Sequence, residues 1–331
     1  EDRDRFDALL TRLDLQKPPS GIARTLEQAV AIATRVGYPV LVRPSYVLGG
    51  RAMKIAHDPK ELDEHFDRMF DAARFENDDA VILVDRFLDD AIEVDVDCVA
   101  DGERVVIGAV MEHLERAGIH SGDSATILPP FTLGADVVFE IERVVRAIAL
   151  ELGVVGLMNT QLAVKGKEVF VLEVNPRASR TVPFVSKATG VPLARIATKI
   201  MLGETLDELG IDDAPLTRHS AAKECVFPFK KLRADTILGP EMRSTGEVMG
   251  IGDTAARAYG RALRAIGIHL KAPRALEGPD MAKNANKAFL SVSPSDRRNV
   301  VEIARRLRAV GFVLTTDAPT AAALAPSRIP S

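Results

Sequence analysis

Two stretches of the chain show the pattern of paired strands joined by tight turns. In residues 92–111, apolar and acidic side chains alternate up to Asp101-Gly102, and an apolar run returns after that turn. Residues 157–174 repeat this arrangement around Lys165-Gly166-Lys167. Period-two alternation on both sides of a short glycine turn indicates an antiparallel hairpin. Long hairpins of this kind do not fit a regular succession of parallel strands, so they favour an α+β architecture.

Helical patterns and short strand patterns flank these hairpins. Apolar residues at helical spacing, with Gly or Pro near the ends, predict the helices, and short apolar runs predict the strands. The expected helices are 26–36, 58–72, 134–153, 193–202 and 204–209, and the expected additional strands are 39–42, 53–56 and 80–84.

The character of the sequence changes after about residue 250. Basic residues recur from Arg257 to Arg274, which indicates a solvated connector. A strand, a helix and a second strand are then expected at 288–292, 297–310 and 312–314, as at the start of a βαβ unit. A domain limit is therefore expected at 287/288.

Composition narrows the classes of protein that fit. Of 331 residues, 47% are hydrophobic and 27% are charged, with a net charge of −4, which is typical of a globular protein without attraction for nucleic acid or anionic lipid. Neither a membrane-spanning apolar run nor a signal peptide is expected.

Cys98 and Cys225 are too few and too far apart for a disulfide framework or a zinc cluster, so we expect buried thiols in the cytoplasm. Because the first residue is not Met, we also expect a piece of a longer polypeptide.

The strand pattern at 168–175 contains the most informative polar residues. Alternation places Phe170, Leu172 and Val174 on one face and Val171, Glu173 and Asn175 on the other. If the preceding turn sets a register in which the numbers of paired residues sum to 334, Gln161 lies opposite Glu173. Carboxylate and amide oxygens suit Mg²⁺ or Mn²⁺ shared with phosphates. The alternative is structural, with Glu173 in a salt bridge to Arg177 or Arg180.

Two further segments have candidate ligand-binding residues. Arg43 precedes a turn with Gly49-Gly50, which is either a phosphate-binding loop or a plain hairpin turn, since no Walker A or Rossmann glycine motif is present. The loop 111–126 concentrates polar residues, among them His113, Glu115, His120, Ser121 and Asp123. It is either a ligand-binding loop or a solvated one. A serine hydrolase is disfavoured because there is no Gly-x-Ser-x-Gly elbow.

Together these segments resemble the large subunit of carbamoyl-phosphate synthase, an ATP-grasp family, most densely over residues 1–252. The matching runs are Glu1-Asp2-Arg3, Arg43 to Met53, Met111-Glu112-His113, His120 to Ser124, Gly156 to Asn159, Glu173 to Gly190 and Leu238 to Gly250. The resemblance implies two α+β subdomains that sandwich ATP, followed by a helical connector and an incomplete α/β domain. The expected domains are an ATP-grasp domain at residues 1–202, its C-terminal extension and connector at 203–287, and the start of a methylglyoxal-synthase-like regulatory domain at 288–331.

The resemblance also implies an activity. That large subunit has two synthetase halves, of which the first phosphorylates bicarbonate and the second phosphorylates carbamate. Thr181-Val182-Pro183-Phe184 and Tyr46-Val47-Leu48 are similar to the second half. The expected reaction is ATP-dependent conversion of carbamate to carbamoyl phosphate, for arginine and pyrimidine biosynthesis. The expected partners are a glutaminase small subunit and the other synthetase half, and assembly into oligomers is compatible with the resemblance.

The site residues implied by the resemblance fall into five groups. Arg3 and Arg43 would contact ATP phosphates beneath a flap with Gly49 and Gly50. The adenosine pocket would comprise Arg86, Leu88, Glu93, Gly118, Ile119, His120 and Ser121, although His is common in relatives at position 86. Gln161, Glu173 and Asn175 would hold two Mg²⁺ or Mn²⁺ ions, the first two also contacting ATP, and K⁺ is a further expected cation. Arg177 and Arg180 would be catalytic. Glu115, Asp123 and Glu224 match positions that bind the activator ornithine.

Two departures and three rival readings qualify this resemblance. Residues 253–287 are longer and more basic than their counterpart, and Thr316 to Thr320 replaces an expected glycine-containing turn. The rivals are a bicarbonate-phosphorylating half, a biotin-dependent carboxylase of the same superfamily, and a noncatalytic nucleotide-binding scaffold.

Overall fold

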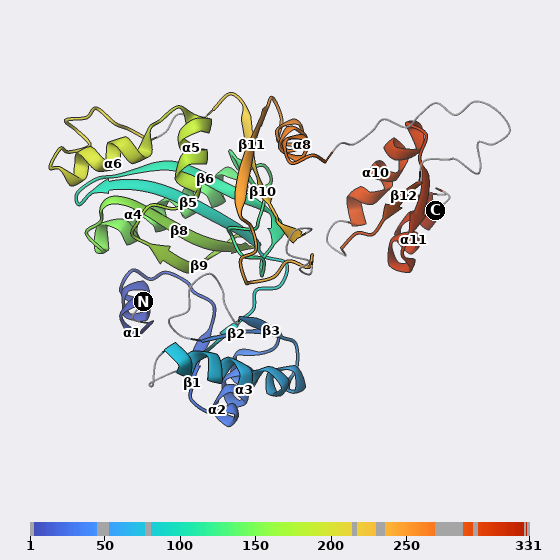
Figure 1. Ribbon diagram of the computed structural model, residues 1–331, viewed down its shortest axis with the longest axis horizontal. Coiled ribbons are helices and arrows are strands. Elements are labelled where there is room, and N and C mark those ends of the chain that lie inside the picture. The colour runs from blue at the N-terminus through green and yellow to red at the C-terminus, as the bar shows by residue number, and fades with distance from the viewer. Residues whose placement is uncertain are drawn as a thin grey trace. The chain divides into compact units, whose positions relative to one another are not determined.

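The computed structural model describes residues 3–44, 53–76, 81–213, 217–229, 236–268, 287–293, 297–327 and 329. The chain divides into two compact units, Glu1–Gly267 and Ile268–Ser331 (Figure 1). Each unit is described below by itself. The three expected domains, with limits at 202/203 and 287/288, stay a prediction.

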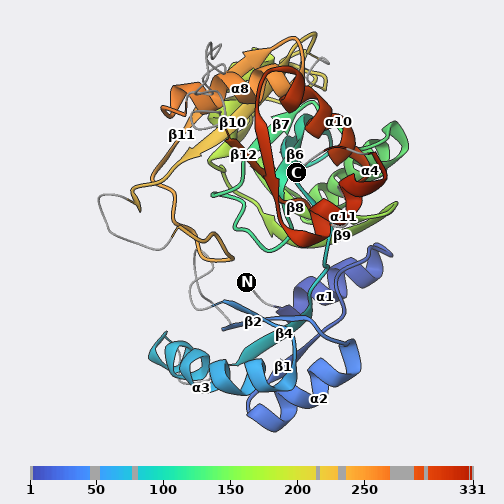
Figure 2. The same cartoon turned by 90° about the vertical axis from the view of Figure 1, so that its right-hand side faces the viewer.

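A four-stranded antiparallel sheet forms the first part of the larger unit. Its strand order is β1-β4-β2-β3, and two helices lie on the same side of it (Figure 2). Apolar side chains of these helices pack on buried valines and isoleucine of the strands, which explains why the helical repeat in the sequence is amphipathic. The elements are β1 (Ser20–Ala23), α2 (Leu26–Val36), β2 (Val40–Pro44), β3 (Lys54–Ala56), α3 (Pro59–Glu76) and β4 (Ile82–Arg86).

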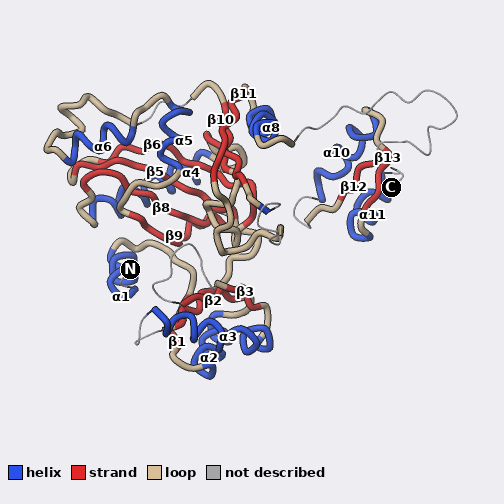
Figure 3. Tube along the Cα trace, viewed as in Figure 1, coloured by secondary structure: helices blue, strands red, loops and turns tan. Residues whose placement is uncertain are grey.

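A seven-stranded antiparallel sheet forms the remainder of this unit. Its order is β11-β10-β7-β6-β5-β8-β9, so the two predicted hairpins, β5–β6 and β8–β9, share the central pairing β5–β8 (Figure 3). The strands are β5 (Ile92–Asp101), β6 (Val105–Arg116), β7 (Thr126–Leu128), β8 (Val155–Lys165), β9 (Glu168–Asn175), β10 (Ser220–Val226) and β11 (Gly246–Gly252).

Helices cover the two faces of the large sheet unequally. One face packs on α4 (Ala135–Glu151) and α1 (Arg3–Arg12), through alternate apolar residues of β5 and β8. The other face packs on α5 (Thr181–Thr189) and α6 (Leu193–Met201) at one end only. At its other end this second face has acidic and amide side chains, which is the polar area where the candidate site lies.

Helix α8 (Ala255–Ala265) lies directly on the backbone of β11. A side-chain carbon added at Gly250 would stand 2.1 Å from the carbonyl oxygen of Ala258, and one added at Gly252 would stand 2.6 Å from its amide nitrogen. This contact therefore depends on glycine in the strand and on the small residues Ala258 and Ala262 in the helix, both fully buried.

The smaller unit contains a parallel strand pair, β12 (Lys287–Leu290) and β13 (Val313–Thr316), joined through α10 (Arg297–Ala309). This confirms the expected strand, helix and strand. Helix α11 (Ala318–Leu324), which was not expected, follows with Asp317 as its cap, and a short 3-10 turn covers Ala325–Ser327.

The α+β prediction is confirmed. With one exception, the expected helices and strands are also present, within a few residues at their ends. The helix expected at 204–209 was wrong. Residues 206–210 form turns in which the Asp101 carboxylate accepts the Leu206 amide at 2.8 Å. Leu206 and Leu209 nevertheless pack in the same hydrophobic cluster as α6, from this turn.

Candidate functional site

The hairpin β8–β9 brings the predicted oxygen ligands to one face of the sheet. Gln161 pairs with Glu173, as expected, and Asn159 pairs with Asn175. On the other side of β8, Gln161 pairs with Asp95 and Asn159 with Asp97. Since cross-strand partners in a sheet share a face, acidic and amide groups line two rows across β5, β8 and β9.

The predicted alternation along β9 was wrong because the strand has a β-bulge. The register shifts so that Leu162 pairs with Val171, which leaves Leu172 as an extra residue. Val171 and Val174 consequently both pack on the α4 side of the sheet, and Phe170 and Leu172 pack on the other side. The bulge thus places Glu173 on the face of Phe170, not on the face of Val171.

The donor set of this face fits a hard divalent cation. The Gln161 side-chain NH₂ donates to Ser121 Oγ at 2.9 Å, so its amide oxygen is the atom presented to a ligand. Glu173 is exposed at the end of the strand pair and supplies a carboxylate. Asn175 Oδ1 accepts from Arg177 Nη2 at 3.3 Å. One carboxylate and two amide oxygens are typical ligands for Mg²⁺ shared with phosphate oxygens. Among the described residues no cluster of three or more His, Cys, Asp or Glu is arranged to hold a metal.

Two arginines follow these ligands. The Arg177 guanidinium donates to the Ala178 carbonyl at 3.1 Å, and Arg180 Nη1 lies 3.2 Å from the sulfur of Met242. Within the described part of the chain no ion pair joins either arginine to Glu173, so the salt-bridge alternative for Glu173 is not what this structure has. Both side chains are exposed next to the oxygen ligands, where guanidinium groups bind anionic oxygens well.

A buried carboxylate on the neighbouring strand fixes the orientation of the Arg43 side chain. Its Nε lies 2.9 Å from Asp85 Oδ2 on the neighbouring strand β4, and Asp85 is only 6% exposed. A guanidinium held through Nε keeps its two terminal NH₂ groups for a second acceptor. Gly49 and Gly50 lie outside the described residues, and so does the Arg3 side chain.

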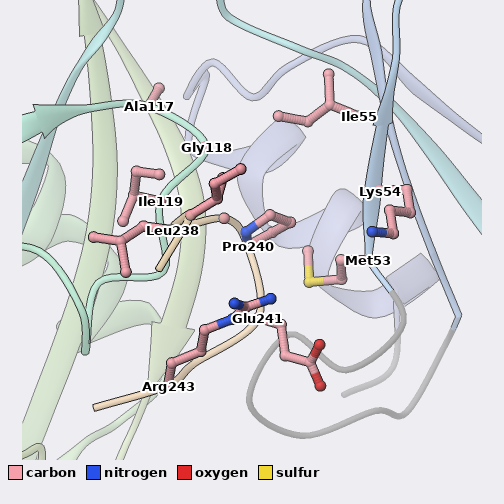
Figure 4. Close-up of a pocket in the computed structure, with 12 residues that line it drawn as sticks. Met53, Lys54, Ile55, Ala117, Gly118, Ile119, Leu238, Pro240, Glu241 and Arg243 are labelled. Carbon is pink, nitrogen blue, oxygen red and sulfur yellow. The ribbon is translucent and has the colours of Figure 1, made fainter. Parts of the chain in front are cut away.

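A cavity of about 360 Å³ lies beside the loop 117–119. Met53, Lys54 and Ile55 border one side, and Ile119 and Leu238 border the other (Figure 4). The Gly118 amide at its wall donates to Glu93 Oε1 at 3.1 Å, and burial raises the pKa of Glu93. The next residues continue toward the oxygen ligands, because Ser121 bonds Gln161. Apolar walls next to a polar, cation-binding face form a suitable site for a nucleotide.

The residues of this cavity outside the loop 117–119 were not assigned from sequence. Residues 53–55 and the segment 237–243 line it, and the His120 amide donates to the Gly239 carbonyl at 2.9 Å. The only signal for the second segment was its place in the motif Leu238 to Gly250, which carried no residue role.

A buried charged network supports the same face from its β6 and β10 side. His113 Nε2 lies 2.9 Å from Asp95 Oδ2, and its Nδ1 lies 3.6 Å from Glu93 Oε2. Burial lowers the pKa of His113, but the hydrogen bond and charge of Asp95, with Glu93, outweigh it and leave that pKa raised. Burial likewise raises the pKa of Asp95, and His113 and Lys223 outweigh it and leave the pKa lowered. The network therefore keeps opposite charges paired inside the sheet.

Comparison with known proteins decides the family. Residues 2–209 match the family described as carbamoyl-phosphate synthase L chain, ATP binding domain. The chain belongs to this family. The carbamoyl phosphate synthase large chains of Ralstonia nicotianae and Archaeoglobus fulgidus are 48% and 50% identical over 100% and 96% of this chain. These matches cover 30% and 28% of the relatives, so the chain spans less than a third of their length.

Solved structures show the same fold at low sequence identity. The biotin carboxylase domain of Hydrogenobacter thermophilus 2-oxoglutarate carboxylase, in complex with MgADP and bicarbonate, aligns at a TM-score of 0.60 with 20% identity, over 70% of this chain and 51% of that one. An ADP complex of N5-carboxyaminoimidazole ribonucleotide synthetase aligns at 0.62 with 14% identity, over 80% and 70%. The chain therefore has the ATP-grasp fold.

Two residues that the ATP-grasp resemblance assigned to adenosine have other contacts here. The Arg86 guanidinium donates to the Val36 carbonyl at 3.1 Å, at the end of α2, where Gly37 leaves room for it. Leu88 is 9% exposed and packs with Ala91 and Ala163. Their nucleotide contacts stay predictions, and the cavity does not include either residue.

Of the three carboxylates expected to bind ornithine, Glu115 lies on β6, Glu224 lies on β10, and Asp123 lies in the loop between β6 and β7. Each accepts a hydrogen bond from a backbone amide: Asp123 from Arg243 and Ser244, Glu115 from Ala125, and Glu224 from Cys225. Burial raises the pKa of Glu115, and nearby Glu224 raises it further. Two close carboxylates favour a cationic ligand, and the ornithine assignment stays a prediction.

Within the part of the chain that the structure describes, none of the helices is both long enough and apolar enough to cross a bilayer.

Proposed function

We propose that this ATP-grasp chain transfers the γ-phosphoryl group of ATP to carbamate, giving carbamoyl phosphate and ADP. The proposal rests on the chemical groups that lie together at the end of the β8–β9 hairpin. Gln161, Glu173 and Asn175 present oxygen ligands on one face, and Arg177 and Arg180 follow immediately. Metal-binding oxygens next to two cations suit transfer of a phosphoryl group between two anions.

The chemistry needs positioning and charge neutralisation more than it needs a base. Carbamate is already an anion, so the attacking oxygen has no proton to lose, and the barrier comes mainly from repulsion between negative groups. Arg177 and Arg180 would bind the carbamate and the transferring group through paired N–H donors. A divalent ion bound by Gln161, Glu173 and Asn175 would neutralise charge on the phosphate oxygens.

The other described residues support nucleotide binding on the same face. Arg43, fixed by Asp85, would donate to the phosphates, and the cavity beside Gly118 and Ile119 would receive the adenosine. Both acyl phosphate and carbamate decompose in water, so closure over the cavity would protect them. We expect Mg²⁺ or Mn²⁺ to be required and K⁺ to be a further cation.

The choice of carbamate over bicarbonate rests on sequence motifs. Thr181 to Phe184, the first turn of α5, and Tyr46 to Leu48, which lie outside the described residues, resemble the second synthetase half. In a complete enzyme this half would act with a bicarbonate-phosphorylating half and a glutaminase subunit in the cytoplasm. The smaller unit would be the beginning of a methylglyoxal-synthase-like regulatory domain, and Glu115, Asp123 and Glu224 would bind ornithine.

Two assays with the purified chain distinguish the two halves. The proposal predicts ATP formation from MgADP and carbamoyl phosphate, with no stimulation of ATP hydrolysis by bicarbonate. Bicarbonate-stimulated hydrolysis without ATP formation would instead assign the chain to the other half. Tight MgATP binding in calorimetry with neither activity would favour a noncatalytic scaffold, and biotin-dependent carboxylation would favour a carboxylase.

A further inference from the structure

Asp97 is a fully buried acid on the face of the sheet that has the candidate ligands. It lies on β5 and has no exposed surface. Its Oδ1 accepts hydrogen bonds from Asn159 Nδ2 at 2.9 Å and from Ser179 Oγ at 2.8 Å, and its Oδ2 accepts one from Thr181 Oγ1 at 2.6 Å. A buried carboxylate is costly unless donors surround it, and here both oxygens have them.

Two of these three donors belong to the segment with the arginines. Ser179 and Thr181 stand on either side of Arg180, and Arg177 lies two residues before Ser179. The two hydroxyl oxygens also lie 2.7 Å apart, so they form one hydrogen-bonded group with the carboxylate. The segment between the end of β9 and the start of α5 is therefore tied to the middle of the sheet by side chains.

The third donor connects the same carboxylate to the ligand strands. Asn159 is 4% exposed and pairs with Asn175 in the ladder, next to the Gln161–Glu173 pair. Asp97 thus contacts β8 beneath the oxygen ligands and also the segment that follows them. A change at Asp97 would alter the distance between the ligand oxygens and the two guanidinium groups.

Helix α5 has no side-chain cap of the ordinary kind. Its N-cap residue is Arg180, whose side chain makes no capping hydrogen bond, and Thr181 is the first helical residue. Helix starts leave backbone N–H groups without helical partners and are commonly fixed by a capping side chain. The bond from Thr181 to Asp97 instead fixes the start of α5 to β5.

We infer that Asp97 is a positioning residue, which holds Ser179 and Thr181 so that Arg177 and Arg180 stay aligned with the oxygen ligands of β8 and β9. The catalytic consequence rests on the proposed function, whereas the attachment itself does not depend on it. Loss of the attachment would leave the arginines present but misplaced. A displacement of about 1 Å at a reacting centre is sufficient to cost about 100-fold in rate.

Thr181 provides the cleanest variants. Thr181→Val keeps the shape and removes the hydroxyl that donates to Asp97, and Thr181→Ser keeps the hydroxyl. Thr160→Val is a matched control, since Thr160 is a fully buried threonine of β8 whose hydroxyl has no partner within the described residues. Asp97→Asn, which replaces the charged acceptor by an amide, is a second route to the same loss.

The readouts are amide hydrogen exchange over residues 177–183 and steady-state kinetics of ATP formation from MgADP and carbamoyl phosphate. We expect Thr181→Val and Asp97→Asn to exchange at least tenfold faster over this segment and to lose about 10- to 100-fold in kcat, with the KM for MgADP unchanged. Thr181→Ser and Thr160→Val are expected to match the original chain in both readouts.

Three results would overturn the inference or separate it from the proposed function. Unchanged exchange in Thr181→Val and Asp97→Asn would overturn the attachment itself. Faster exchange with unchanged kcat would show that the attachment is structural and not positioning. If the original chain forms no ATP, the proposed function fails, and the exchange data alone decide whether Asp97 holds the segment.

Discussion

Arg86 uses its guanidinium to hold the last turn of α2, because Nη1 donates to the Val36 carbonyl, one of the carbonyls that a helix end leaves without a partner. Arg86→Met should therefore lower the free energy of unfolding by about 1 kcal/mol and leave the affinity for MgADP unchanged. Urea denaturation and calorimetry test this, with the exposed Arg24→Met as the control. Weaker nucleotide binding at unchanged stability would instead support the adenosine contact that the family resemblance implies.

His113 should make stability depend on pH in a defined direction. Its raised pKa contributes stability that is complete below its ordinary value of about 6.5 and is lost as the pH rises through the higher folded value. The lowered pKa of Asp95 contributes stability above about 3.9 that is lost as the pH falls. Besides Asp95, the charged groups around His113 are Glu93, which lies on β5 like Asp95, and Lys223 on β10.

The measurement is the difference in unfolding free energy between the original chain and His113→Gln. Glutamine still donates to Asp95 but carries no charge. The difference is expected to be larger at pH 5.5 than at pH 9. An equal difference at both values would contradict an ion pair between His113 and Asp95.

Several residue positions followed from the sequence and others did not. The hairpin and its turn were predictable, but the pairing of Gln161 with Glu173 depends on the bulge, since the turn register that pairs Lys165 with Glu168 would by itself place Leu172 opposite Gln161. The bulge at Leu172 was not predictable, because an extra residue in a run of Val, Phe and Leu leaves the apolar pattern unchanged. The contact of Arg86 with α2 was also hidden, because it joins segments 50 residues apart.

At the scale of elements, the packing of α8 on β11 depends on glycines that admit no side chain. Gly250→Ala would place a methyl group 2.1 Å from the Ala258 carbonyl oxygen, so the helix must move away from the strand. We expect a loss of about 1–3 kcal/mol of unfolding free energy. Gly246→Ala on the same strand is the control, since its added carbon meets only Val226 at 3.9 Å. Equal stability of the two variants in urea denaturation would contradict this packing.

The hairpins and long helices were predictable because one face of each packs on a core. Such packing makes apolar residues recur at regular spacing in the sequence. Strand order was not predictable, because the pairings of β7 with β10 and of β5 with β8 join strands that lie far apart in the sequence. The segment 237–243, which borders the cavity, was missed for the same reason, because its contacts with His120 and Arg180 join distant parts of the sequence.

At the scale of the whole molecule, the ATP-grasp fold places the candidate cation ligands, two arginines and a cavity within the unit Glu1–Gly267. The relatives are more than three times as long as this chain. The central claim is narrower: the end of the β8–β9 hairpin transfers a phosphoryl group.

The most direct test is ATP formation from carbamoyl phosphate and MgADP by two variants of β9. Glu173→Gln removes the carboxylate among the oxygen ligands, and Glu168→Gln removes an equally exposed carboxylate at the other end of the strand. We predict that Glu173→Gln lowers kcat by about 100-fold or more at unchanged melting temperature, and that Glu168→Gln keeps the original rate. A Glu173→Gln protein that forms ATP at the original rate would contradict the account.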